Sequence, residues 1–260
     1  MSGVALLGRV FLDFLASIGA ISIFSGKIIK SFFRFKFYWK QIVRQMLFVG
    51  YYSLPVVGLT AIFTGAVLAL QSYTGFSRFN AESSIASVVV LSITRELGPV
   101  LAGLMLAGRV GAAIAAEVGT MKVTEQIDAM EVSAINPFKY LVVTRVIATT
   151  MILPILTIYV IFLSIIGGFI ALTISQGMNF EYYKNAVVTS VTFGDLIPSI
   201  SKTFVFGYIV GIVGSYKGYI ADGGTEGVGR ASTTAVVLAS LIILLFDTVL
   251  VKISLMIWPL

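Results

Sequence analysis

The sequence contains neither cysteine nor histidine, and only 12% of its 260 residues are charged. Without these two side chains the chain cannot build a thiolate or imidazole metal site, a cysteine nucleophile or a Ser-His-Asp triad. No disulfide can form, so the sequence gives no indication of the redox compartment. Asp, Glu, Lys, Arg and Tyr remain as the ionisable side chains, and we expect no cofactor and no metal.

The shortage of charge accompanies an excess of apolar residues, which make up 58% of the chain. An average soluble domain carries roughly 25% charged residues, because its surface must be solvated. The composition therefore predicts an all-α integral membrane protein with a single membrane domain over residues 1–260. In so apolar a chain, the net charge of +6 indicates basic residues that orient spans and meet anionic lipid, and no nucleic-acid partner is expected.

Hydrophobic runs predict five membrane-spanning helices, at about residues 48–71, 84–107, 141–174, 197–216 and 234–258. Pro55 lies in the first turns of span 1, where it is tolerated or kinks the helix. Span 3 is long enough to tilt or to contain a break at Pro154. Most of the 18 basic residues fall on one side if the N-terminus is cytoplasmic, which predicts a periplasmic C-terminus.

The first 45 residues are predicted to be an interfacial amphipathic segment, because the apolar part of residues 3–30 is too short and interrupted to span. Basic residues are then interleaved with aromatic ones, a mixture that suits the lipid headgroup layer. These residues are Lys27, Lys30, Arg34, Lys36, Lys40 and Arg44, with Phe32, Phe33, Phe35, Phe37, Tyr38 and Trp39. Nucleic-acid binding uses the same residue types but requires an additional partner.

Two connections are long, residues 108–140 on the inner side and 175–196 on the outer, periplasmic side. The inner one contains an apolar stripe at helical spacing, and Asn136-Pro137 is expected to stop that helix. The stripe is Val123, Ile127, Met130 and Ala134, with Glu125, Asp128 and Glu131 to its sides. The helix either rests on the membrane or docks a cytoplasmic partner. Its acidic face favours docking, since anionic lipid would repel it.

Charges inside apolar spans are the strongest functional signal. Arg95 and Glu96 precede Gly98-Pro99 near the predicted midpoint of span 2, and adjacent helix residues point about 100° apart, so each needs another partner. Lys202 in span 4 and Asp247 in span 5 bring the formal charge of the four to zero. Pairing among spans 2, 4 and 5 is therefore expected, either as a structural ion-pair network or as part of a binding site.

Small residues recur every three or four positions, a spacing that lets helices approach closely. The rows are Gly103, Ala107, Gly111, Ala115 and Gly119; Gly108, Ala112 and Ala116; and Gly207, Gly211, Gly214 and Gly218. Packing within the chain is the favoured interpretation, with a dimer interface as the alternative. No Walker A motif occurs, so the chain is not expected to hydrolyse ATP.

Five short segments follow one another in span 2 and the connection after it: Arg95-Glu96-Leu97-Gly98-Pro99, Ala107-Gly108-Arg109, Ala116 to Met121, Thr124 to Ile127 and Asn136-Pro137. Together they resemble the MlaE-type permease. That permease is the membrane subunit of the Mla phospholipid-transport ABC system and is related to the chloroplast TGD lipid permease. The resemblance covers the whole chain. It implies a homodimer in the bacterial inner membrane with phospholipid in a cavity between the subunits. It further implies cytoplasmic ABC ATPase subunits on a coupling helix at residues 117–137, a periplasmic MCE-domain hexamer, and in some systems a STAS-domain protein.

On this basis Arg95 and Lys202 are predicted to attract the lipid phosphate, with Glu96 and Asp247 balancing charge and Leu68, Leu70 and Leu97 along the acyl-chain path. The predicted ATPase-coupling residues are Glu117, Lys122, Glu125, Gln126, Asp128, Met130 and Glu131.

Two other functions fit the composition. A secondary transporter would use Glu96 or Asp247 as a proton relay and need no ATPase. A structural scaffold would anchor the outer ring, and its buried charges would affect assembly only.

Overall fold

The computed structural model describes residues 3–32, 38–79, 81 and 84–257. The predicted headgroup residues at positions 33–37 and the predicted end of span 5 at Trp258 lie outside the described residues. So do the side chains of residues 3–11, 13–15, 17–18 and 32.

Five helical segments of the described chain are long and apolar enough to cross a membrane, which confirms the predicted fold class. Their bounds are Trp39–Phe79, Ile85–Val123, Phe138–Gln176, Phe193–Tyr219 and Gly224–Ile257. The second and third contain 39 residues each, a length of about 58 Å at helical rise, and the hydrocarbon core is only about 30 Å thick. These two spans therefore project well beyond the membrane.

Three of the spans are composed of several helical pieces. Span 1 consists of α2 (Trp39–Gly50), a short 3-10 turn (Tyr51–Ser53), α3 (Leu54–Phe76) and a final 3-10 turn (Ser77–Phe79). Span 2 consists of α4 (Ile85–Ser92), a π-helical turn (Ile93–Leu97), α5 (Gly98–Leu106), a second π-helical turn (Ala107–Gly111) and α6 (Ala112–Val123). Span 3 begins with a π-helical turn (Phe138–Val143) and continues as α8 (Thr144–Gln176), uninterrupted by Pro154.

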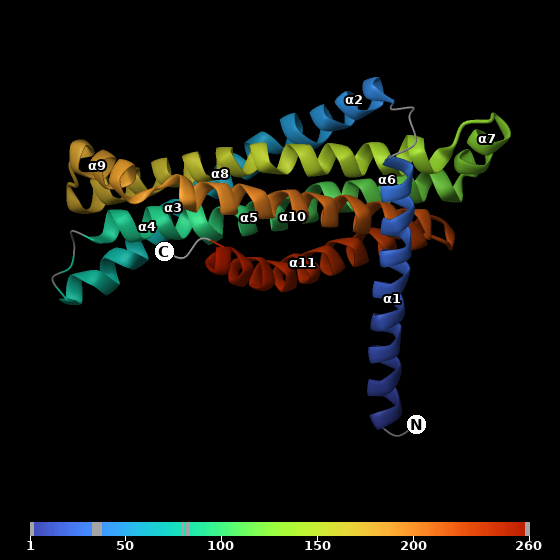
Figure 1. Cartoon of the computed structure of the whole chain (residues 1–260), viewed down its shortest axis with the longest axis horizontal. Helices are drawn as coiled ribbons and strands as arrows, with labels where there is room; N and C mark the ends of the chain where they lie inside the picture. Colours follow the sequence, from blue (N-terminus) through green and yellow to red (C-terminus); the bar gives the residue numbers. More distant parts are fainter. Residues whose placement is uncertain (1–2, 33–37, 80, 82–83, 258–260) are drawn as a thin grey trace.

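The remaining helices are α1 (Gly3–Phe32), α7 (Gln126–Val132), α9 (Phe180–Ser190), α10 (Phe193–Tyr219, span 4) and α11 (Gly224–Ile257, span 5). The five spans run side by side, with α7 at one end of the bundle and α9 at the other (Figure 1). We call these the α7 end and the α9 end. The helix α1 runs across the direction of the spans near the α7 end (Figure 1), an orientation that suits a helix lying along a membrane surface.

The second half of α1 is held on the bundle by aromatic contacts. The ring of Phe24 packs edge-on against Phe138 and Tyr216, with centroids 5.1 and 5.3 Å apart. The hydroxyls of Ser25 and Tyr208 are hydrogen-bonded at 2.7 Å. These contacts join α1 to spans 3 and 4.

Small residues bring the helices of the bundle into close contact, as their spacing predicted. A β-carbon at Gly65 of α3 would overlap the carbonyl of Ser164 in α8, so only glycine fits there. In α10, a β-carbon at Gly214 would lie 2.9 Å from the carbonyl oxygen of Gly111. The row that begins at Gly108 differs, because a β-carbon at Gly108 would meet no atom within 4 Å. The interpretation as packing within the chain therefore fits two of the three predicted rows.

Spans 1 and 2 are longer than predicted. Span 2 was expected to end near residue 107 but continues to Val123, because the residues from Ala112 to Gly119 are mostly small or apolar and pack against α10 and α11. Span 1 was expected to begin at residue 48, yet α2 is helical from Trp39 and buries Ile42, Gln45 and Val49. The segment that contains Lys40 and Arg44 is therefore the first part of span 1.

The predicted outer connection, residues 175–196, contains the helix α9. The side chain of Asn179 caps it by accepting a hydrogen bond from the backbone N–H of Glu181 at 3.0 Å. Tyr183 is buried and its hydroxyl donates to the carbonyl of Ile165 at 3.1 Å, which holds α9 against α8. Burial raises the pKa of the Tyr183 phenol to about 12, so it remains a neutral donor at physiological pH.

The predicted inner helix at residues 117–137 is divided in the structure. Glu125 has a left-handed backbone (φ 58°) and separates α6 from α7, so the stripe from Val123 to Ala134 is not one continuous helical face. Asn136 and Pro137 do not stop α7, which already ends at Val132. They begin the next helix instead, since the Asn136 side chain accepts a hydrogen bond from the backbone N–H of Lys139 at 3.1 Å.

Candidate functional site

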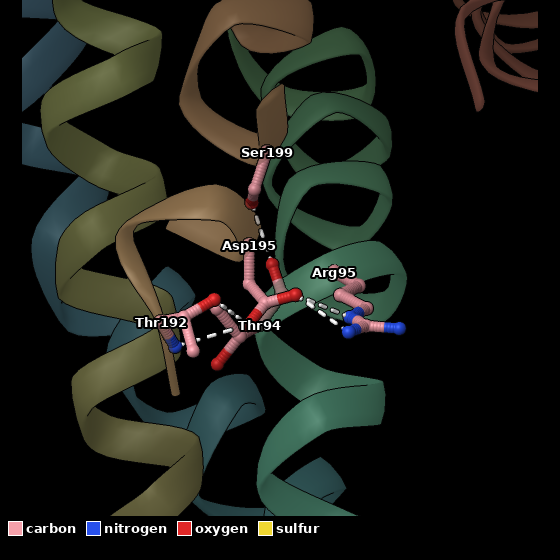
Figure 2. Close-up of polar contacts among 5 residues, drawn as sticks. All are labelled: Thr94, Arg95, Thr192, Asp195 and Ser199. Atoms are coloured by element: carbon pink, nitrogen blue, oxygen red, sulfur yellow. Dashed lines mark hydrogen bonds and ion pairs between the residues drawn. The ribbon is translucent and has the colours of Figure 1, made fainter. Parts of the chain in front are cut away.

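The buried charges of span 2 lie on a distorted turn. In the π-helical turn Ile93–Leu97, the N–H of Gly98 bonds to the carbonyl of Ile93, five residues earlier. In that register the next N–H would donate to the carbonyl of Thr94, but residue 99 is proline and has none. The hydroxyl of Ser199 in α10 donates to this carbonyl at 2.5 Å in its place (Figure 2). The distortion of span 2 is thus stabilised by a side chain from span 4.

Arg95 points from this turn toward the start of α10, where it meets Asp195. Two guanidinium nitrogens, Nη2 and Nε, lie 2.6 and 2.7 Å from Oδ1 of Asp195. The other carboxylate oxygen accepts hydrogen bonds from the backbone N–H and the hydroxyl of Thr192, at 3.0 and 2.7 Å. The third guanidinium nitrogen points away from Asp195 (Figure 2). Arg95 therefore retains donors for another acceptor.

Asp195 is fixed by the local structure of its own helix. With Thr192 it forms a reciprocal capping box at the start of α10, and its side chain is only 3% exposed. A buried carboxylate is costly unless it is paired and hydrogen-bonded, and here both kinds of partner are present. The start of α10 thus supplies a rigid anion that holds Arg95.

Lys202 lies two turns further along α10 and is almost fully buried. Its ammonium nitrogen is 2.6 Å from Oε2 of Glu96 and 3.1 Å from Oδ1 of Asp247. The side chains of Glu96 and Asp247 are 43% and 16% exposed, so the triad opens at Glu96. The expected pairing among spans 2, 4 and 5 is found, and Arg95 and Glu96 have separate partners, as predicted from their angular separation.

These two ion-pair groups border one hollow. It is lined by Arg95, Glu96, Asp195, Ser199 and Lys202, together with apolar and small residues of α10 and α11: Gly194, Pro198, Val251, Ser254 and Leu255. The cavity measures about 50 Å³, room for a few water molecules at most. The three carboxylates of Glu96, Asp195 and Asp247 face two cations, so the group of five carries a formal charge of −1.

The hollow is nearer to the α9 end than the sequence predicted. Span 2 runs from Ile85 to Val123, so Arg95 and Glu96 lie in its first third and not at its midpoint. Asp195 lies in the first turn of span 4. The predicted position at the midpoint of span 2 was wrong because it depended on an end of span 2 placed well before Val123.

The predicted acyl-chain residues lie outside the lining of this hollow. Leu68 is half-buried against the cluster around Ala69 and Ile85, Leu70 is 40% exposed, and Leu97 is half-buried on span 2. The apolar lining comes from Pro198 of α10 and from Val251 and Leu255 of α11 instead.

The predicted coupling residues gather at the α7 end. Lys122 and Asp128 pair at 3.4 Å across the break between α6 and α7. Glu125, Gln126 and Glu131 are exposed, whereas Met130 is half-buried and packs on the main core. These side chains therefore present a polar surface around a helix that the buried Ile127 anchors.

Glu117 has a different environment from the other predicted coupling residues. It lies within α6 and pairs with Arg145 of α8 at 2.9 Å. The Arg145 side chain is 1% exposed and also donates from Nη1 to the carbonyl of Leu141 at 2.8 Å. This pair ties spans 2 and 3 together toward the α7 end.

Sequence reasoning missed Asp195 and Arg145. Asp195 belongs to a segment predicted as an outer connection, where a carboxylate is ordinary, although Thr192 three residues earlier is a helix-start signature that would have placed it in span 4. Arg145 was counted among the inner basic residues that orient the chain. Its position in the first turns of span 3 carries no comparable signal.

Comparison with known proteins adds independent information. Residues 42–253 match the family model described as Permease MlaE. A probable ABC transporter permease protein of Rickettsia felis is 49% identical over 239 residues, 92% of each chain. The intermembrane phospholipid transport system permease protein MlaE of Haemophilus influenzae is 34% identical over 253 residues, 96% of each chain. Protein TRIGALACTOSYLDIACYLGLYCEROL 1 of Arabidopsis thaliana, a chloroplastic protein, is 32% identical over 231 residues, 89% of this chain and 66% of that protein.

Proposed function

Since this chain belongs to the MlaE permease family, we propose that it is the membrane permease subunit of an ABC transporter that moves phospholipid between the inner and outer membranes of a bacterial envelope. The name of the Haemophilus relative supports this substrate. The observation that carries the proposal is the hollow that Arg95 and Lys202 both line within apolar spans. Charges within membrane-spanning segments are costly and are characteristic of substrate pathways.

In this proposal Arg95 and Lys202 receive the phosphate of the headgroup. Asp195 holds Arg95 through two of its nitrogens, and the third is left for a phosphate oxygen. Arginine suits this role because its planar donors match phosphate geometry. Glu96 and Asp247 pair with Lys202 and hold it in position when lipid is absent, since an unpaired buried ammonium would be strongly destabilising.

The acyl chains need space that one chain does not enclose. A cavity of about 50 Å³ cannot hold a phospholipid, so the lipid must extend over an outer face of the bundle. The helix α11 offers such a face, with Leu241, Leu245 and Val249 each at least half exposed. We propose that a second copy covers this face in a homodimer, and that Leu68, Leu70 and Leu97 extend the apolar path.

ATP hydrolysis is assigned to separate ABC ATPase subunits that dock at the α7 end. The exposed coupling residues around α7 offer them a polar surface, and the Glu117–Arg145 pair would transmit a displacement of that end to spans 2 and 3. The α7 end is then cytoplasmic and the α9 end periplasmic, where an MCE-domain hexamer would continue the lipid path. A STAS-domain protein would bind the ATPases.

The test is transfer of a fluorescent phospholipid by the complex reconstituted with its ATPase. Replacing Arg95→Gln together with Asp195→Asn removes the cation while leaving a neutral hydrogen-bonded pair, so folding is preserved. We expect transfer to fall by about tenfold or more, since a hydrogen bond to a charged group contributes about 1.5–3 kcal/mol.

A control variant removes two exposed basic residues elsewhere. Arg78 and Lys252 are both exposed, and the variant Arg78→Gln/Lys252→Gln should transfer lipid at the normal rate. Normal transfer by the Arg95→Gln/Asp195→Asn variant, with ATP hydrolysis intact, would refute the headgroup role of Arg95.

A further inference from the structure

The start of span 1 forms a second basic hollow, remote from the buried charges. It is lined by the exposed face of α2, by Tyr38 before that helix and by Tyr140 at the beginning of span 3, and its volume is about 840 Å³, within the range of ligand-binding clefts. Figure 1 shows the start of α2 on the side of the bundle that carries α7, whereas α9 lies at the far end. This hollow and the Arg95 hollow therefore belong to opposite halves of the spans.

The amphipathic pattern of α2 directs its basic side chains into this hollow. Ile42, Gln45 and Val49 are buried against the bundle. Lys40 and Arg44, four residues apart, share the opposite face and are exposed. Neither forms an ion pair with any residue that the structure describes.

Aromatic residues frame the two cations. The rings of Tyr38 and Tyr140 meet edge-on, with centroids 5.3 Å apart, and connect the start of span 1 to the start of span 3. Trp39 also lines the hollow and is 68% exposed. Tyrosine and tryptophan at the end of a span mark the headgroup level of a bilayer, so Lys40 and Arg44 lie at the depth of lipid phosphates.

An apolar strip continues from the cations along the same face of α2. Val43 and Leu47 also line the hollow and are each more than half exposed. Cations at headgroup level followed by exposed apolar residues toward the membrane interior match the two parts of a phospholipid.

The charge of the hollow is of one sign only. Among the described residues that line it there is no carboxylate. Two other hollows at the α7 end differ, because one contains Asp222 and Glu226 together with Lys217 and Arg230, and the other contains Glu131. The charge of the hollow at the start of α2 therefore favours an anionic ligand, whereas the charges of the other two do not.

We infer that this hollow is a binding site for an anionic phospholipid of the leaflet at the α7 end, with the lipid phosphate on Lys40 and Arg44 and its acyl chains along Val43 and Leu47. Such a lipid would stay in place as a bound ligand of the permease. The site does not depend on the proposed transport path or on which leaflet the α7 end faces.

The experiment is a lipid titration of the delipidated, detergent-purified protein, followed by native mass spectrometry. Phosphatidylglycerol and phosphatidylcholine are compared, because both have a phosphate and acyl chains but only the first has net negative charge. The variant Lys40→Gln/Arg44→Gln is compared with the exposed-charge control Arg78→Gln/Lys252→Gln, which changes the net charge equally.

We expect the wild type and the control to retain phosphatidylglycerol in preference to phosphatidylcholine. In the Lys40→Gln/Arg44→Gln variant, the ratio of bound phosphatidylglycerol to bound phosphatidylcholine should be about 25-fold lower at low salt. Each basic side chain near an anionic surface contributes about a factor of five to the affinity. The Arg95→Gln/Asp195→Asn variant should keep the preference, which separates this site from the proposed transport site.

Three results would overturn the inference. The first is an equal preference in the Lys40→Gln/Arg44→Gln variant and the wild type. The second is loss of preference in the Arg95→Gln/Asp195→Asn variant alone, which would assign the bound lipid to the transport site. The third is displacement of phosphatidylglycerol by inorganic phosphate at equal concentration, which would make the site one for a free anion.

Discussion

At the residue scale, the carbonyl of Thr94 depends on a single hydroxyl. Replacing Ser199→Ala leaves that buried carbonyl without a donor and should lower the free energy of unfolding by about 1–3 kcal/mol. The matched control is Ser201→Ala, because Ser201 lies two residues away on α10 but is exposed and bonds within its own helix. Thermal unfolding of both variants in detergent measures the difference, and equal midpoints would contradict the proposed dependence.

Single residues of the site were predictable where their chemistry conflicts with their surroundings. Charge is rare in apolar stretches, so four residues stand out in the sequence: Arg95, Glu96, Lys202 and Asp247. Because adjacent helix residues point about 100° apart, the sequence also indicates that Arg95 and Glu96 do not pair with each other. Asp195 was missed because the start of span 4 was predicted at residue 197 from hydrophobicity, and the helix-start signature at Thr192 was not used. Which cation meets which carboxylate depends on the relative rotation and height of three spans, and no local pattern encodes these.

At the scale of elements, the contact between α3 and α8 depends on the absence of a side chain at Gly65. Gly65→Ala would force the two helices apart and should cost about 1–3 kcal/mol, the usual range for overpacking. Gly75 is in the same helix, but a β-carbon there would meet no atom within 4 Å, so Gly75→Ala should be neutral or slightly stabilising. Denaturation midpoints in detergent compare the two, and a stable Gly65→Ala variant would mean that the helices are not packed this closely.

The helix α7 ends in a motif that normally contains glycine. Ala134 has a left-handed backbone (φ 55°), while the N–H of Ile135 bonds to the carbonyl of Met130 and that of Ala134 to Glu131. Ala134→Gly should therefore stabilise the end of α7 by about 1 kcal/mol, and Ala134→Val should destabilise it.

Hydrogen exchange of the α7 amides measures this effect locally. Slower exchange in the glycine variant and faster exchange in the valine variant are expected. The same order of exchange rates in α9, at the far end of the bundle, would indicate a global change and contradict a local one.

Elements were predicted well in number and poorly in their ends. Hydrophobicity determines that five helices cross the membrane, because each needs about twenty apolar residues. Hydrophobicity does not determine where a helix stops once it leaves the lipid. Span 2 continues to Val123 because its last part, α6, packs against α10 and α11. The division at Glu125 was also missed, since a glutamate with a left-handed backbone has no sequence signature.

At the scale of the whole molecule, the absence of cysteine makes orientation directly measurable. Single cysteines at Ser133, next to α7, and at Asn185, in α9, would each be the one thiol of the chain, and both positions are exposed. With the α7 end cytoplasmic, a membrane-impermeant maleimide should label the Asn185→Cys variant in spheroplasts. It should label Ser133→Cys only after permeabilisation, and the reverse pattern would invert the proposed topology.

Because the hydroxyl of Ser199 takes the place of the N–H that Pro99 lacks, the residue needed at position 199 depends on the residue at position 99. A relative with proline at the first position needs a hydrogen-bond donor at the second, whereas a relative with any other residue at 99 has its own N–H and leaves 199 free to vary. Substitutions at these two sites, a hundred residues apart in sequence, should therefore be inherited together.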